Sequence, residues 1–181
     1  RTRMIQSIDD MAAMLNDILA LARSGAGIEV PAPIALGPWL DAMVADYAER
    51  GLAVTRGAGD DDAHVTARPL LLARAVRNLI DNGLAYGQQA EVRLHRRPDG
   101  VAITIADRGP GIDPAKLQSL LEPFARGEES RSRATGGAGL GLAIAQMVAD
   151  GEGGRLELVN RSDAPGLEAR IILPAGRADQ Q

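Results

Sequence analysis

The first part of the chain carries apolar residues at alternating spacings of four and three. These positions are occupied by Met4, Ile8, Met11, Leu15, Ile18 and Ala22. The spacing is the heptad pattern of a helix whose apolar seam packs against a partner helix. One such helix cannot bury its own seam. The pattern therefore predicts a bundle-type helix over residues 1–25, and packing of this helix on its own domain is the alternative.

Beyond this helix the apolar pattern changes between helical and strand periods. Prolines and glycines predict a linker over residues 26–36. We expect helices over residues 36–50, 69–85, 113–121 and 140–150, and strands over 52–55, 64–66, 90–95, 101–106, 156–159 and 167–173. Helices mixed with strand pairs predict a two-layer α/β sandwich, in which a mixed, largely antiparallel sheet is covered by a layer of helices. We assign residues 37–174 to this domain and 175–181 to a tail.

Composition narrows the class of protein. The chain of 181 residues has 20 Lys and Arg against 24 Asp and Glu, and this net charge of −4 gives no electrostatic reason to expect nucleic-acid binding. It has no cysteine, which excludes disulfides and cysteine catalysis and fits a reducing compartment. No apolar run approaches the roughly 20 residues of a membrane span, and no signal peptide is visible. We expect a cytoplasmic location, and a first residue other than Met indicates a piece of a longer protein.

Candidate chemistry begins in the helix predicted from residue 69, with the segment R-N-L-I-D-N-G-L-A-Y-G at residues 77–87. Asn78 and Asn82 are four residues apart and share one face of the helix. Their carboxamide oxygens suit Mg²⁺, which prefers hard oxygen ligands together with waters and phosphates. The alternative is a pair of exposed or helix-capping asparagines.

A second segment, D-R-G-P-G-I at residues 107–112, follows a predicted strand directly. A carboxylate at a strand end, here Asp107, can accept a hydrogen bond from an exocyclic amine. Gly109 and Gly111 allow the backbone to approach a flat ring closely. The alternative is an ordinary turn of Asp, Gly and Pro.

Two more segments follow. G-G-A-G-L-G-L-A-I at residues 136–144 places glycine-rich backbone at the start of a helix, where free N–H groups and the helix dipole attract anions. E-P-F-A-R-G at residues 122–127 lies in a charged stretch that continues to residue 137 and is typical of a mobile loop. The alternative for the glycine-rich segment is a flexible loop, and the alternative for residues 122–127 is a solvated loop with an anchoring aromatic.

The four segments, in this order and at these spacings, resemble the N box, first glycine box, F box and second glycine box of the ATP-binding domain of sensor histidine kinases. This domain is of the same superfamily as the ATPase domains of gyrase and MutL. The resemblance covers about residues 36–174. The predicted helix before it looks like the second helix of the dimerisation and phosphoacceptor domain.

The resemblance implies roles for individual residues. Asn82 and Asn78 would hold Mg²⁺ against the phosphates of ATP. Asp107 would take the adenine amino group, and Tyr86 would pack near the base or reach a phosphate. The adenine ring and the phosphates would be contacted by Gly109, Gly111, Ile112, Gly137, Gly139, Leu140, Gly141 and Leu142.

The same resemblance makes residues 122–137 the lid over ATP. Phe124 would latch this lid, and Arg126 or Arg131 would approach the γ-phosphate. Arg126, Arg131 and Asn78 would then be the catalytic residues. Two positions depart from the family pattern, because Ala85 stands where Lys or Arg is usual and Ala138 where Thr is common.

The phosphoacceptor of the family is absent from this chain. It would be a His followed by an acidic residue on a helix before residue 1. His64 lies in a strand-like stretch and His95 beside a hairpin turn, and neither has that pattern. The implied function is therefore that of an ATP-binding phosphoryl donor which does not label itself. Its implied partners are the acceptor helix of its own kinase, a response regulator and, through the first helix, a second copy of the chain.

Two other functions stay open. A nucleotide-binding regulatory or interaction module without competent transfer is favoured by Ala85 and Ala138. A Ser/Thr kinase of the anti-sigma type on the same fold is weaker, because the leading helix resembles a bundle helix.

Overall fold

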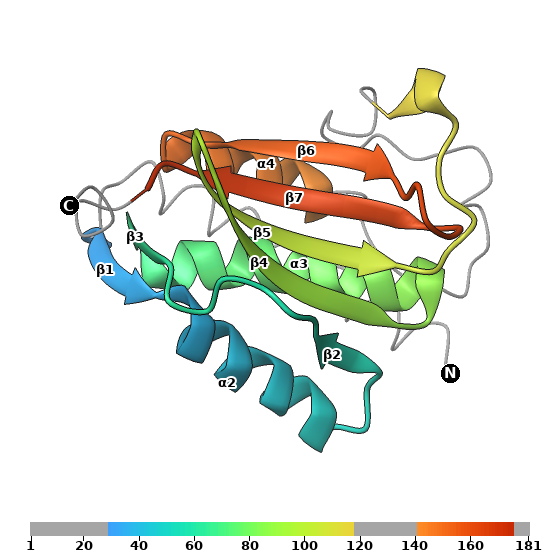
Figure 1. Ribbon diagram of the computed structural model, residues 1–181, viewed down its shortest axis with the longest axis horizontal. Coiled ribbons are helices and arrows are strands. Elements are labelled where there is room, and N and C mark those ends of the chain that lie inside the picture. Colours follow the sequence, from blue (N-terminus) through green and yellow to red (C-terminus); the bar gives the residue numbers. More distant parts are fainter. Residues whose placement is uncertain (1–28, 118–140, 176–181) are drawn as a thin grey trace, which may run out of the picture.

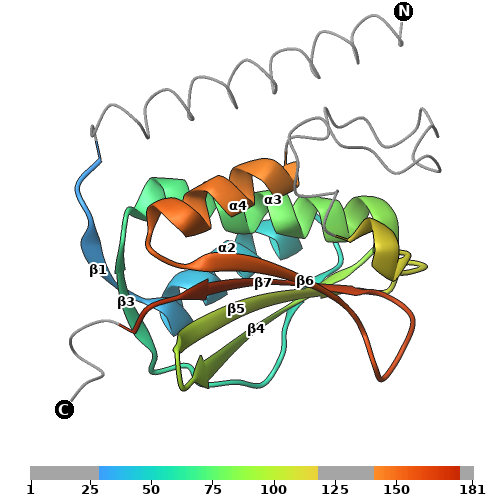
Figure 2. The same ribbon diagram turned by 90° about the horizontal axis from the view of Figure 1, so that it is seen from above.

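The computed structural model describes residues 29–117 and 141–175. In chain order the elements are β1 (Ala32–Ala35), α2 (Leu36–Glu49), β2 (Val54–Arg56), β3 (His64–Ala67), α3 (Pro69–Gly87), β4 (Ala90–Arg97), β5 (Gly100–Asp107), the 3₁₀-helix η1 (Pro114–Lys116), α4 (Gly141–Gly151), β6 (Arg155–Asn160) and β7 (Leu167–Leu173). Five strands form one sheet in the order β2-β4-β5-β7-β6, and β1 pairs with β3 separately. Helices α2, α3 and α4 cover one face of the larger sheet (Figures 1 and 2).

The sheet is mixed and largely antiparallel. Of its four pairings, only β2 with β4 is parallel. Together with the helix layer on one face, this confirms the predicted two-layer α/β class. The predicted bundle helix, the predicted lid and most of the second glycine box lie outside the described residues.

The core lies between the sheet and the helices. All of β5 is buried, and its Val101, Ile103 and Ile105 belong to the core shared with the helices. Helix α3 contributes Leu72, Val76, Leu79 and Ile80, each at most 1% exposed and recurring at the helical spacing. Burying one such side chain stabilises the fold by about 1.5–3 kcal/mol.

Helix α3 is fixed at its first turn and on its side. Glu29 caps it, because the backbone N–H groups of Leu70 and Leu71 donate to its two carboxylate oxygens at 2.6 and 3.2 Å. Midway along the helix, the buried Tyr47 of α2 donates its hydroxyl to Asp81 at 2.8 Å. Burial, with this hydrogen bond, raises the pKa of Tyr47 above its ordinary value. These contacts set the position of the helix that carries the asparagine pair.

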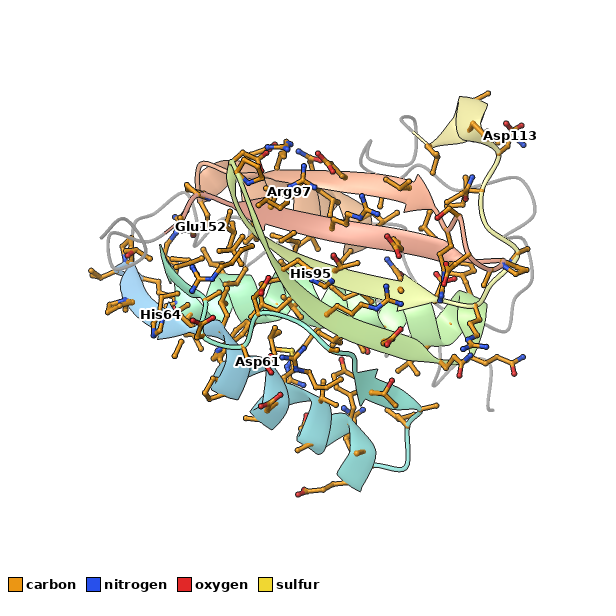
Figure 3. The ribbon with its side chains drawn as sticks, viewed as in Figure 1. Asp61, His64, His95, Arg97, Asp113 and Glu152 are labelled. Atoms are coloured by element: carbon orange, nitrogen blue, oxygen red, sulfur yellow. The ribbon has the colours of Figure 1, made fainter. Side chains whose placement is uncertain are left out.

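The chain joins the fold earlier than the predicted domain start at residue 37. Strand β1 lies within the predicted linker and pairs with β3 over Ala32–Ala35, and Leu36 is fully buried. The hairpin after His95 is also tighter than expected, because β4 runs on to Arg97 and pairs there with Gly100. His95 is therefore a strand residue on the face opposite Leu94 (Figure 3).

Candidate functional site

The asparagine pair lies where α3 meets the beginning of α4. A Cβ atom placed on Gly141 would lie 3.5 Å from Nδ2 of Asn82 and 3.7 Å from Cβ of Asn78. Nδ2 of Asn78 is buried and has no hydrogen-bond partner among the described residues. A buried amide group without a partner is costly, so this position suits a polar ligand group. The end of the second glycine box and the N box are thus brought together.

Asp107 is the last residue of β5 and is 8% exposed. Its Oδ1 atom accepts hydrogen bonds from the backbone N–H of Gly109 at 2.8 Å and of Leu167 at 3.1 Å. Both of these hydrogen bonds use Oδ1, and Oδ2 takes part in none within the part of the chain that the structure describes. One carboxylate oxygen therefore holds the loop, and the other is available to a donor.

The end of α3 packs directly on the backbone after Asp107. A Cβ on Gly87 would lie 2.7 Å from both the Arg108 nitrogen and Cβ of Asp107, and a Cβ on Gly109 would lie 3.0 Å from the Tyr86 carbonyl oxygen. One turn earlier, a Cβ on Gly83 would lie 3.6 Å from Cβ of Asp107. The glycines let the helix that carries the asparagines approach the aspartate. The N box and the first glycine box are thereby joined into one site.

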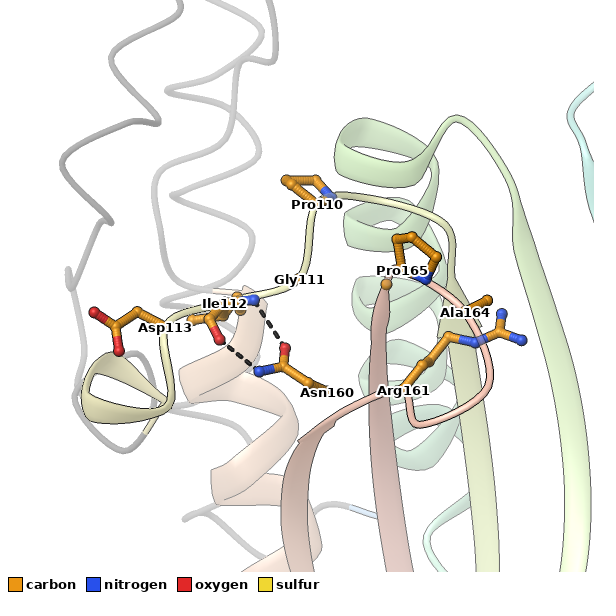
Figure 4. Close-up of a pocket in the computed structure, with 9 residues that line it drawn as sticks. Pro110, Gly111, Ile112, Asp113, Asn160, Arg161, Ala164 and Pro165 are labelled. Carbon is orange, nitrogen blue, oxygen red and sulfur yellow. Dashed lines mark hydrogen bonds between the residues drawn. The ribbon is translucent and has the colours of Figure 1, made fainter.

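The turn between β6 and β7 forms the other side of the loop after Asp107 (Figure 4). Asn160 donates from Nδ2 to the carbonyl of Ile112 at 2.6 Å and accepts at Oδ1 from the N–H of Ile112 at 2.8 Å. Arg161 donates to the carbonyl oxygen of Asp107 at 3.2 Å. Between this turn and residues 110–113 lies an open pocket of about 420 Å³.

Sequence reasoning missed this turn. An Asn at the end of a predicted strand has many ordinary explanations, and nothing local links it to a loop 48 residues earlier. Gly166 carried the one usable signal, a glycine before a strand. Its φ is +138°, and a Cβ there would lie 2.2 Å from the carbonyl oxygen of Asp107.

Arg161 stays charged and anchored beside the site. Its hydrogen bonds to Asp163, at 2.7 Å for the closer one, raise the pKa of the guanidinium above its ordinary value. The same pair lowers the pKa of Asp163 to about 2. The arginine side chain is only 6% exposed. It therefore acts as a fixed donor to the backbone of Asp107 at neutral pH.

The remaining predicted residues fall into two groups. Gly111 lies in the same loop with φ +75°, Leu142 follows Gly141 in α4, and the side chain of Tyr86 is at the surface, with the residue 53% exposed. Outside the described residues lie Phe124, Arg126, Arg131, Gly137, Gly139 and Leu140. The described part of the site therefore comprises the N box, the first glycine box, and Gly141 and Leu142 of the second glycine box.

The described residues offer a metal ion carboxamide ligands at the asparagine pair. Within residues 29–117 and 141–175, no group of three or more His, Cys, Asp or Glu could hold a metal ion. A cation at the asparagine pair would be bound by carboxamide oxygens together with ligand oxygens and water. This fits Mg²⁺, which retains waters and is bound largely through substrate phosphates.

Comparison with known proteins agrees with this architecture. The chain matches the family described as histidine kinase-, DNA gyrase B-, and HSP90-like ATPase over residues 67–177. It is 33% identical over 192 residues to the signal transduction histidine-protein kinase/phosphatase MprB of Mycolicibacterium smegmatis, an alignment that covers 98% of this chain and 37% of that protein. To the signal transduction histidine-protein kinase BaeS of Escherichia coli it is 31% identical over 179 residues, covering 94% of this chain and 38% of BaeS.

Solved structures give the same result. The mycobacterial sensor histidine kinase MprB matches with a TM-score of 0.63 and 28% identity, covering 81% of this chain and 99% of that chain. The ATP binding domain of PrrB from Mycobacterium tuberculosis matches with a TM-score of 0.64 and 25% identity, covering 80% and 97%.

The chain therefore belongs to the histidine kinase-, DNA gyrase B-, and HSP90-like ATPase family. Within that family its relatives are sensor histidine kinases, which confirms the resemblance that the four motifs predicted. The chain spans less than two fifths of the length of MprB and BaeS. No helix within its described residues is long and apolar enough to cross a membrane.

Proposed function

We propose that this domain binds Mg-ATP and is the phosphoryl donor of a sensor histidine kinase whose acceptor histidine lies on another helix. The observation that carries the proposal is the free oxygen of Asp107. It lies beside the helix that bears Asn78 and Asn82, so one end of the site offers an acceptor for a base and the other end offers carboxamides for phosphates.

The described residues would divide the nucleotide between them. Oδ2 of Asp107 accepts from the adenine amino group, while Gly111 and Ile112 line the ring. Asn78 and Asn82 face the phosphates together with the amino end of α4, whose dipole favours negative charge. Mg²⁺, held through Asn82 and Asn78, supplies neutralisation of phosphate charge. The contribution of the domain to transfer is then mostly positioning of the phosphates.

The partners follow from the same proposal. The γ-phosphoryl group of ATP passes to a histidine on the acceptor helix, leaving ADP, and from there to a response regulator. The kinase is a homodimer formed through the bundle-type helix, and this domain lies in the cytoplasm. Neither histidine of this chain fits the acceptor role. His64 lies on β3 with Nδ1 2.8 Å from the Asp62 carbonyl oxygen, and His95 lies on the sheet face away from the helices (Figure 3).

A second candidate is a nucleotide-gated interaction module without transfer. It is favoured by Ala85, which is exposed on α3 and brings no cation where the family has Lys or Arg. Transfer of labelled phosphate to an added acceptor-helix fragment separates the two, because only the donor function labels the histidine of that fragment.

Substitution of Asp107 by Asn tests the base-binding end. Oδ1 already accepts from two N–H groups, so the amide oxygen must take that position and the amide nitrogen must replace Oδ2. A donor then faces the adenine amino group, which costs about 1–3 kcal/mol, or roughly a tenfold to hundredfold loss of ATP affinity. Inosine triphosphate, which has an oxygen at this position, should bind relatively better to the variant.

Calorimetry with both nucleotides measures this change of preference. Asp113→Asn is the control, because it removes the same charge from an exposed residue six positions later, whose hydrogen bond from the Ala115 N–H an asparagine can also accept. Unchanged ATP affinity in a folded Asp107→Asn variant would remove Asp107 from the site.

A further inference from the structure

We infer that Asn160 is a positioning residue of the nucleotide site, which fixes the Gly111–Ile112 segment and thereby sets the preference for adenine. The inference rests on the proposed function, since it concerns the same site. Asn160 belongs to none of the four motifs and comes from the opposite side of the loop, at the end of the edge strand β6 (Figure 4).

The contact is a two-sided clamp on one residue. Asn160 uses both atoms of its carboxamide, and it engages both backbone polar groups of Ile112, at 2.6 and 2.8 Å. Each hydrogen bond is partly shielded from water. A single side chain thus fixes both the place and the orientation of this backbone segment.

The clamp needs a glycine beside it. Gly111 has φ +75°, and a Cβ there would lie 3.0 Å from Oδ1 of Asn160. A side chain at residue 111 would therefore be strained by the backbone angle and would press on the clamping oxygen. The backbone angle and the contact with Asn160 therefore explain why residue 111 is a glycine, and the sequence alone did not predict this explanation.

Asn160 also ties the ring-lining segment to the base-binding carboxylate. In the β6–β7 ladder Asn160 lies opposite Leu167. The N–H of Leu167 donates to Oδ1 of Asp107, while Asn160 holds Ile112. One pair of facing residues therefore fixes Asp107 and Ile112 relative to each other. The distance between the carboxylate oxygen and the ring-lining backbone is set from outside the loop.

Two consequences follow for base recognition. Because the N–H and C=O of Ile112 are both engaged by Asn160, base selection in this loop depends on Oδ2 of Asp107. Without Asn160 the loop would populate other positions, and apparent affinity falls in proportion to the competent fraction. The freed backbone groups of Ile112 would also become available to bases other than adenine.

The test compares ATP and inosine triphosphate on the folded chain, with Mg²⁺ present, by calorimetry. We expect Asn160→Ala to weaken ATP about tenfold and inosine triphosphate much less, so that the ratio of the two affinities shrinks. Asn160→Asp keeps the acceptor for the Ile112 N–H but turns a second acceptor toward the Ile112 carbonyl, and it should shrink the ratio as well. It also serves as the second variant if Asn160→Ala does not fold.

Val159→Ala is the control. Val159 precedes Asn160 on the same edge strand, its side chain points to the other face of the sheet, and it is 37% exposed. Val159→Ala should leave the ratio of ATP affinity to inosine triphosphate affinity unchanged. A general loosening of β6 would instead change this ratio in Val159→Ala as much as in the Asn160 variants. Equal weakening of the two nucleotides by both Asn160 variants, or no weakening, overturns the positioning role.

The outcome for the wild-type chain separates this inference from the proposed function. A wild-type chain that binds neither nucleotide contradicts both. A wild-type chain that prefers ATP, with Asn160 variants that prefer it equally, overturns only the role of Asn160.

Discussion

Replacing Gly87 by Ala should disturb the nucleotide site through a single methyl group. Gly87 is the last residue of α3, and its missing side chain lets the helix end lie on the backbone after Asp107. The new Cβ would lie 2.7 Å from the nitrogen of Arg108 and 2.7 Å from Cβ of Asp107. Ordinary van der Waals contact begins at 3.4 Å, so the helix end and the loop must separate by about 0.7 Å.

The cost can be estimated from this displacement. Overpacking a well-packed site typically costs about 1–3 kcal/mol of unfolding free energy. The usual gain from Ala over Gly, about 0.5–1 kcal/mol in a helix interior, is small at a final residue. A shift of this size also exceeds the range of lengths over which a hydrogen bond stays strong. We therefore expect ATP affinity to fall roughly tenfold, since the proposed hydrogen bond from the adenine amino group to Asp107 would be lost.

Gly83→Ala is the matched comparison on the same helix. Its Cβ would lie 3.1 Å from Cβ of Ala90 and 3.6 Å from Cβ of Asp107, and it sits in the helix interior. The propensity gain there offsets the mild crowding, so stability should stay within about 1 kcal/mol of wild type.

Urea unfolding and titration with a fluorescent ATP analogue measure the two effects. Gly87→Ala should lower both stability and affinity, and Gly83→Ala should leave both close to wild type. If Gly87→Ala matches the wild-type chain in both assays, the close approach of α3 does not position Asp107, and the reasoning is refuted.

Two further predictions concern α3. Tyr47→Phe should lower the unfolding free energy by about 1–2 kcal/mol at pH 7, because it removes the hydrogen bond to Asp81. The folded-state pKa of Tyr47 lies above its unfolded value of about 10, so the unfolding free energy of the wild-type chain should fall as pH rises above 10. Chemical unfolding across this pH range should show a smaller fall for the variant. Asn82→Ala should remove most of the dependence of ATP affinity on Mg²⁺ without unfolding the domain. Titration of ATP with and without a chelator measures this dependence. A variant that keeps the wild-type Mg²⁺ dependence would show that Asn82 is not a ligand of the metal.

The sequence alone predicted those elements whose formation depends on the pattern of neighbouring residues. Periodicity placed α3 and its asparagine face, and alternation placed β4 and β5, because burial on one face imposes a repeat on the residues themselves. The motif spacing then predicted that the N box and the first glycine box share a site. Contacts of Gly83, Gly87 and Gly109 with the Asp107 loop account for that proximity.

What the sequence did not reveal depends on pairing between distant segments. Strand β1 is only four residues long and contains Pro33, so this segment reads as linker, and only its pairing with β3 makes it a strand. Asn160 acquires its contact with Ile112 from the register of β6 on β7. No local pattern contains that register. The glycines predicted to bind phosphates and the residues predicted to form the lid lie mainly outside the described residues, and their roles stay predictions.

The place of β5 in the sheet has a consequence for biosynthesis. One edge of β5 pairs with β4, its immediate neighbour in the chain, but the other pairs with β7, which begins 60 residues after Asp107. During translation one edge of β5 therefore stays unpaired until β7 has left the ribosome. An open apolar edge is a template for pairing with other chains. A polypeptide that stops before Leu167, and so lacks β7, should accordingly aggregate, even though every residue of the N box and of the first glycine box has already been made.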